Sequence, residues 1–280
     1  RRRGLDHARG ETTETTEMTD QRHVSPDAER SESERAKTYW LSYGAGVNST
    51  ALLILLATGK LPQYTPFRVL FSDTKTERPE TYAYLKRIDE WAGKNGVTIE
   101  RCEPKEGVLE RWKKTSFTGS RMFRSCTVEA KIRPMEKYIK EHGTADDPKL
   151  IGIHAGEMHR AKLACQGERT RIYPLVDIDI DHEGCQTIIR DAGLCVPFKS
   201  GCWCCPFMRV REILELARDW PERFEEIIKL EEAANAKRGS DTIRMQWGKP
   251  AREYLKRVHE LDHLPFDDEN DQLPCECFSS

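Results

Sequence analysis

The feature that most constrains the fold is an alternation of strand-like and helix-like segments over residues 38–155. Aromatic and β-branched content typical of strands occurs in "TYWLSYG" (38–44), "FRVLFSD" (67–73), "VTIERCEP" (97–104) and "KLIGIHA" (149–155). Between them, residues 49–59, 79–96 and 128–143 have helical apolar spacing, although Pro134 predicts a kink or a late start in the last of these. Strands that alternate with helices form parallel sheets covered on both faces, so we predict an α/β, Rossmann-like fold.

The rest of the chain divides into a tail and a C-terminal region. Residues 1–37 are poor in aromatics and rich in Thr, Glu, Arg and Ser, and we predict that they form a disordered tail. The α/β domain then covers residues 38–200, with a further strand-like piece at 171–180 and a helical one at 185–194. Residues 201–280 are predicted to form a helical, cysteine-rich C-terminal extension.

Composition excludes several classes of function. The 45 lysines and arginines nearly balance the 47 acidic residues, so the net charge of −2 favours neither nucleic acid nor a membrane surface as a general partner. No apolar run has the length of a membrane span, and residues 1–37 lack the apolar core of a secretory signal. We expect a cytoplasmic protein without a membrane partner.

A glycine-rich loop follows the first predicted strand in "SYGAGVNSTALL" (42–53). Such loops let backbone amides approach a phosphate, and the helix that follows adds positive potential at its N-terminus. Asn, Ser and Thr at these positions are also ordinary helix caps, so the loop alone leaves a plain capped helix as an alternative. The segment expected to line an anion site consists of Ser42, Gly44, Ala45, Gly46, Asn48, Ser49 and Thr50.

A second polar segment, "FSDTKTERPETY" (71–82), places Asp73 and Thr74 just past the second predicted strand, at the same edge of the sheet. Together the two segments resemble the PP-loop ATP pyrophosphatase and phosphoadenosine phosphosulfate (PAPS) reductase branch of the adenine nucleotide alpha-hydrolase superfamily. "GAGVNS" is similar to the SGGxDS loop, with Gly44 in place of serine and Asn48 in place of aspartate. "DTKTERPETY" is similar to DTG-x-x-x-PETY, with Lys75 in place of glycine.

The resemblance extends to "RSCTVEAKIRP" (124–134) and "IGIHAGEMHRAK" (151–162), and covers residues 38 to about 210. It implies an adenine nucleotide alpha-hydrolase-like fold, and ATP or PAPS bound by the loop, by Asp73 and by Thr74. It also implies that Arg124, Lys131 and Arg160 are cations that bind phosphate or sulfate groups. Arginine is suited to this role because its guanidinium can donate two hydrogen bonds to one such group. We expect Asn48, Arg124 and Arg160 to take part in catalysis. The loss of the aspartate at position 48 removes charge that would help to organise Mg²⁺.

The ten cysteines favour metal or redox chemistry, because a reducing compartment disfavours structural disulfides. Cys202 and Cys205, in "KSGCWCCPFM", have the spacing that directs two thiolates at one metal. By resemblance to cluster-binding reductases, Cys126 joins them, and we add Cys185 as a fourth ligand, with Cys204 as its substitute. A 4Fe-4S cluster is the preferred occupant and zinc is the alternative. A further alternative is that these cysteines are buried free thiols that bind no metal.

Three functions follow as hypotheses. In the first, the resemblance implies an ATP pyrophosphatase that activates a DNA or tRNA acceptor for sulfur transfer, as in DNA phosphorothioation or tRNA thiolation, with a cysteine desulfurase as a potential sulfur donor. In the second, the chain is a PAPS or APS reductase in which Cys277, in the tail "LPCECFSS", attacks sulfur and a thioredoxin-like donor completes the reduction. In the third, it is a zinc-stabilised nucleotide-binding module without catalysis.

Overall fold

A computed structural model describes residues 37–116, 119, 125–161, 168–245 and 248–263, all within the unit Ala36–Ser280. Five strands form one parallel sheet: β1 (Tyr39–Tyr43), β2 (Phe67–Ser72), β3 (Ile99–Cys102), β4 (Lys149–Ile151) and β5 (Arg171–Ile172). Their order is β3-β2-β1-β4-β5, with Leu41 opposite Val69 on one side and Leu150 on the other. The predicted Rossmann-like parallel sheet is confirmed.

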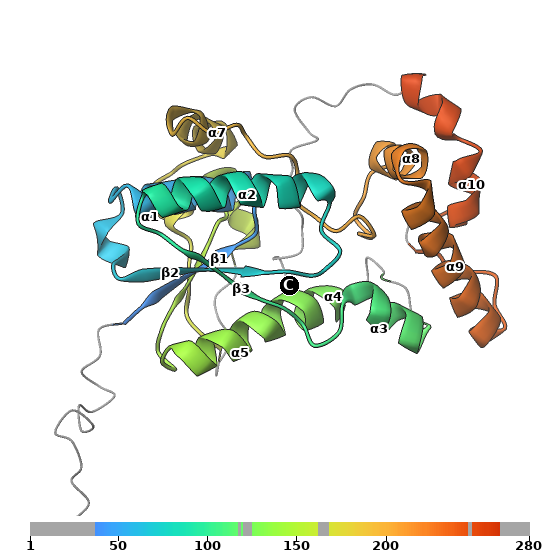
Figure 1. Cartoon of the computed structure of the whole chain (residues 1–280), viewed down its shortest axis with the longest axis horizontal. Coiled ribbons are helices and arrows are strands. Elements are labelled where there is room, and N and C mark those ends of the chain that lie inside the picture. The colour runs from blue at the N-terminus through green and yellow to red at the C-terminus, as the bar shows by residue number, and fades with distance from the viewer. Residues whose placement is uncertain (1–36, 117–118, 120–124, 162–167, 246–247, 264–280) are drawn as a thin grey trace, which may run out of the picture. The chain divides into compact units, whose positions relative to one another are not determined.

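Helices cover both faces of the sheet (Figure 1). Helices α1 (Val47–Ala57), α2 (Pro79–Lys94) and α7 (His182–Asp191) lie on one face, and α5 (Arg133–His142) lies on the other. Every residue of α1 from Val47 to Leu56 is buried, because this helix lies between the sheet and α7. A helix that is apolar on all sides needs such a position. Among the described residues, no helix is both long and apolar enough to cross a bilayer.

The helix predicted over residues 128–143 has an irregular start. A short turn, α4 (Ser125–Thr127), leads into the π-helical segment η4 (Val128–Ile132), and α5 follows with Pro134 in its first turn. Proline is tolerated there because the first amides of a helix have no partner within the helix. The wider turns of η4 place Lys131 among buried groups on the sheet side.

The strand-like segment 171–180 is mostly not a strand. Only Arg171 and Ile172 pair with β4, and α6 (Pro174–Asp177) begins two residues later. Three further short elements lie between the strands: η3 (Pro62–Tyr64), α3 (Val108–Thr115) and η5 (Ala155–Arg160).

The C-terminal region is helical, with α8 (Val210–Asp219), α9 (Pro221–Arg238), α10 (Ala251–Leu255) and η6 (Val258–His263). These helices form a second apolar cluster that also contains Trp203 and Cys204. Val108 and Trp112 of α3 and Ala130 of η4 belong to the same cluster, so residues that precede position 200 help to build the core of the C-terminal helices.

Candidate functional site

A narrow pocket lies where the strand order reverses. The chain runs from β1 outward to β2 and β3, and then returns to place β4 on the other side of β1. In open α/β sheets, ligands bind beyond the carboxyl ends of the strands at such a switch point. The residues that line the pocket are Ser42, Gly44, Gly46, Val47, Asn48, Ser49, Lys131, Ile151, Gly152, Ile153, Arg160 and Ser200. Its cavity volume is about 50 Å³, far below the several hundred cubic ångströms of pockets that enclose whole ligands, so it suits a phosphate group rather than a nucleotide.

The loop between β1 and α1 is held by its own hydroxyl group. Ser49 Oγ accepts a hydrogen bond from the Gly44 amide and donates one to the Gly46 carbonyl, each at 3.2 Å. Ala45 has a φ of +56°, in the left-handed region that costs a residue with a side chain some strain. No side chain caps α1 at Gly46, which leaves its first-turn amides for a ligand.

Gly152 lets the β4 end approach this loop. A Cβ atom at this position would lie 2.8 Å from both the amide nitrogen and the Cα of Ser49. Only a glycine fits against a backbone at that distance, so the pocket wall formed by β4 requires a glycine here.

Two cations line the pocket from different elements. Lys131 projects from η4 and Arg160 from η5, and the two residues are only 8% and 9% exposed. Lys131 Nζ lies 3.2 Å from Glu77 Oε1. Burial by itself lowers the pKa of Lys131. The charge of Glu77 and its hydrogen bond to Lys131 act in the opposite direction, and the net pKa of Lys131 is raised, so this lysine is charged at neutral pH.

Asn48 meets a buried carboxylate. Its Nδ2 donates to Glu157 Oε2 at 3.1 Å, and Arg160 Nη1 donates to Glu157 Oε1. His154 Nε2 lies 3.5 Å from the same carboxylate. His154 Nδ1 accepts a hydrogen bond from the Gly156 amide, so the neutral ring carries its proton on Nε2, facing Glu157.

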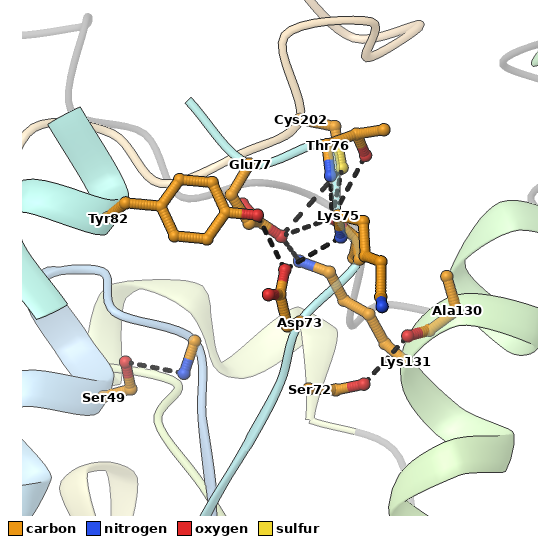
Figure 2. Close-up of polar contacts among 12 residues, drawn as sticks. Ser49, Ser72, Asp73, Lys75, Thr76, Glu77, Tyr82, Ala130, Lys131 and Cys202 are labelled. Carbon is orange, nitrogen blue, oxygen red and sulfur yellow. Dashed lines mark hydrogen bonds and ion pairs between the residues drawn. The ribbon is translucent and has the colours of Figure 1, made fainter. Parts of the chain in front are cut away.

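A second group of polar contacts surrounds the turn after β2 (Figure 2). Asp73 Oδ1 accepts hydrogen bonds from Tyr82 Oη at 2.7 Å and from the Lys75 amide at 2.8 Å. Thr74 is buried, and its hydroxyl donates to Glu77 Oε1 at 3.1 Å. Asp73 and Thr74 therefore hold the turn, and Glu77 is bonded from two sides by Thr74 and Lys131.

The cysteine-rich segment docks on this turn. Glu77 and Cys202 form an antiparallel bridge, and the Trp203 amide donates to the Thr76 carbonyl at 2.9 Å. Cys202 Sγ lies 3.3 Å from Thr74 Oγ1. Cys202 and Cys205 are close enough to Lys131, which lines the pocket, to interact with it electrostatically.

Burial keeps these thiols protonated. Together with Glu77, it raises the pKa of Cys202 to about 12, and burial raises that of Cys205 to about 11. Burial also raises the pKa of Cys126 and Cys204.

The predicted metal site does not fit this geometry. Cys126, Cys202 and Cys205 pack against the same apolar cluster, with Cys204 buried in it. Yet within residues 37–263, leaving out the gaps, no group of three or more Cys, His, Asp or Glu side chains is arranged to hold a metal ion.

The structure places Cys185, the fourth expected ligand, in a different apolar cluster from the other three cysteines. Cys185 is fully buried in α7, within the core cluster between α7 and α1, whereas the other three cysteines pack against the C-terminal cluster. Its pKa is raised to about 12 by burial and by Asp181 and Glu157. A core position on the α1 side of α7 explains this cysteine without a metal.

Comparison with protein families matches residues 38–182, more than half of the chain, to the phosphoadenosine phosphosulfate reductase domain. The chain belongs to this family. The match contains β1 to β5 and every residue of the pocket except Ser200.

Two solved structures with a similar fold are the phosphoadenylyl-sulfate (PAPS) reductase from Candida auris, in a phosphate complex, and the U34-tRNA thiolase NcsA from Methanococcus maripaludis with its 4Fe-4S cluster. The first is 18% identical at a TM-score of 0.45, and the alignment covers 62% of this chain and 84% of that one. The second is 14% identical at a TM-score of 0.44, and covers 83% of this chain and 75% of that one. No protein with a curated description matches the chain significantly.

Of the residues predicted to bind nucleotide in this PAPS reductase-family chain, Ser42, Gly44, Gly46, Asn48, Ser49, Lys131 and Arg160 line the pocket. Thr50 does not, because its buried hydroxyl lies 3.2 Å from that of Tyr43 in the core. Ala45 shapes the loop without lining the pocket. Arg124, Cys277 and the tail 1–36 lie outside the described residues.

Sequence reasoning missed Gly152, Glu157, Glu77 and Ser200. The glycine inside the predicted strand 149–155 was a signal for Gly152, because an isolated glycine in a strand pattern marks a bulge or a close backbone approach. Glu157 and Glu77 were not singled out because each also bonds a distant residue, Asn48 and Lys131 respectively, and sequence spacing does not reveal such contacts.

Proposed function

We propose that this chain binds ATP with its phosphates in the switch-point pocket and catalyses attack of an acceptor oxygen on the α-phosphorus. The observation that carries the proposal is the pocket itself, in which Lys131 and Arg160 face the uncapped N-terminus of α1. Two buried cations and a helix N-terminus form an environment that favours a polyphosphate.

In this reaction the acceptor oxygen forms a bond to the α-phosphorus, and the bond from that phosphorus to the bridging oxygen breaks. Pyrophosphate leaves with the electron pair, and the acceptor becomes an adenylate ester. Mg²⁺ enters as part of the Mg-ATP substrate, which binds the ion mainly through its phosphates. Lys131 and Arg160 neutralise charge that develops on the leaving group, and the α1 amides hold the phosphates in place.

The acceptor that we propose is a nucleic acid activated for sulfur transfer. The terminal sulfur of a persulfide, such as a cysteine desulfurase generates, would displace AMP and form a disulfide between the acceptor and the donor cysteine. A thiol reductant would then cleave that disulfide and release the thiolated acceptor. The retained Gly-x-Gly-x-Asn-Ser loop favours this function over reduction of a sulfonucleotide. The family match favours reduction of PAPS as the second candidate.

The test compares both reactions in one preparation. The full chain is incubated with Mg-ATP, with and without bulk tRNA or plasmid DNA, and AMP and pyrophosphate are quantified; parallel samples receive PAPS with reduced thioredoxin, and sulfite is measured. We expect equal amounts of AMP and pyrophosphate, more with nucleic acid present, and a loss of at least about tenfold in Arg160→Gln. Sulfite without pyrophosphate would replace the proposal by the second candidate, and neither product would leave only a non-catalytic role.

A further inference from the structure

The pocket contains two polar residues from different elements that share one partner. Asn48 belongs to the first turn of α1 and Arg160 to η5, and both line the pocket. Glu157 does not line it, but one of its carboxylate oxygens bonds to Asn48 and the other to Arg160. The Glu157 residue is 7% exposed, so this carboxylate is a buried link between the two pocket walls.

The chemistry of the link fixes the orientation of Asn48. A carboxylate only accepts hydrogen bonds, so the amide must turn its Nδ2 toward Glu157. This leaves Asn48 Oδ1 buried and without a hydrogen-bond partner among the residues that the structure describes. The same carboxylate holds the guanidinium of Arg160, which lines the pocket.

We infer that Glu157 is a positioning residue for phosphate binding, because its carboxylate holds Asn48 and Arg160 in the pocket walls. The inference rests on the proposed binding of a nucleotide in this pocket. An aspartate at position 48 would place two carboxylates within hydrogen-bond distance of each other. Two such carboxylates repel each other, so one of them must take up a proton or move away. Either change would weaken the contact between Glu157 and the Arg160 guanidinium.

The test is a charge exchange between the two positions. Asn48→Asp alone is expected to weaken ATP binding by about 100-fold, and Glu157→Gln alone by about tenfold, because a charge-assisted hydrogen bond is lost. The variant that carries both changes restores one carboxylate and one amide, and should bind within about threefold of Glu157→Gln. Asn48→Ala is the matched control, and should lose less affinity than Asn48→Asp since it removes the contact without adding charge.

Binding of ATP and of inorganic pyrophosphate is measured by isothermal titration calorimetry, with circular dichroism to confirm that each variant is folded. Affinity of Asn48→Asp equal to that of the natural chain, or a double variant no better than Asn48→Asp, would overturn the inference while leaving the proposed function intact. No binding of either ligand by the natural chain would overturn both. If Asn48→Asp does not fold, Arg160→Gln replaces it: this change should weaken ATP binding, and adding Glu157→Gln should cause no further loss.

Discussion

Gly152 and Ser49 show how single residues of the pocket depend on distant segments. Ser49 was predicted as a phosphate donor, yet its hydroxyl bonds the Gly44 amide and the Gly46 carbonyl and so shapes the loop. Thr50 and Thr74 were also predicted to face the ligand, but their hydroxyls bond other protein groups in buried positions. The sequence indicates which residue types gather at the site, but residue type alone does not show that each of these hydroxyls bonds a nearby protein group instead of facing a ligand.

Replacement of Gly152 tests the close approach of β4 to the loop. Gly152→Ala places a Cβ 2.8 Å from the backbone of Ser49, and we expect the free energy of unfolding to fall by about 1–3 kcal/mol, as for other overpacked sites. Urea denaturation measures the change. Gly93→Ala, in α2, is the matched control, because nothing lies within 4 Å of its added Cβ and alanine favours a helix by up to about 1 kcal/mol. Equal effects of the two substitutions would contradict the packing described for Gly152.

At the scale of elements, periodicity predicted most helices and strands of the sheet domain, with boundaries shifted by a few residues. The clearest error is segment 171–180, where alternating apolar residues suggested a strand and Pro174 instead begins α6. In the C-terminal region, α8 ends at Asp219 and Pro221 begins α9. In both places a proline decides the boundary, because it cannot continue the hydrogen bonding of the element before it.

One buried carboxylate ties the start of β1 to the segment before β4. Asp147 is 1% exposed, and it accepts hydrogen bonds from the Thr38 amide, Trp40 Nε1 and both the amide and the hydroxyl of Thr144. Burial raises its pKa, but these hydrogen bonds outweigh burial, and the net pKa of Asp147 is lowered.

The stability of this connection should depend on pH. Since the folded chain holds Asp147 ionised below the usual carboxyl range, its contribution is complete above the pKa of the unfolded chain and is lost as pH falls toward the lowered pKa. Asp147→Asn should therefore reduce the free energy of unfolding by about 1–3 kcal/mol at neutral pH, and the difference should shrink on acidification. Urea denaturation at neutral and acidic pH measures this. Asp146→Asn, at the exposed neighbouring position, should show little effect at either pH, and a constant deficit of Asp147→Asn at all pH values would contradict the assignment.

At the scale of the whole molecule, the alternation of elements predicted a parallel sheet but not the order of its strands. That order creates the switch point between β1 and β4, and with it the site. The C-terminal helices were predicted as an extension, yet their apolar cluster includes Val108, Trp112 and Ala130 from earlier in the chain. Cys185 was grouped with the other cysteines from its position before a predicted helix, which indicates local structure but not which apolar cluster the helix joins; α7 places it in the cluster that contains α1.

A larger cavity offers a competing site for an anion. Its volume is about 710 Å³, and its basic lining consists of Lys137, Lys140, Lys149, Arg169 and Arg171. It adjoins the start of β4 and β5, opposite to the strand ends at which ligands bind in such sheets. The smaller pocket lies beyond the carboxyl ends of the strands, so we expect nucleotide there.

Hydrogen–deuterium exchange with and without Mg-ATP locates the bound nucleotide directly. We predict slower amide exchange in peptides that cover residues 44–50 and 151–160, where the loop, Gly152 and Arg160 surround the pocket, and unchanged exchange in those that cover residues 136–149. Slower exchange confined to 136–149 would place the nucleotide in the larger cavity and contradict the account.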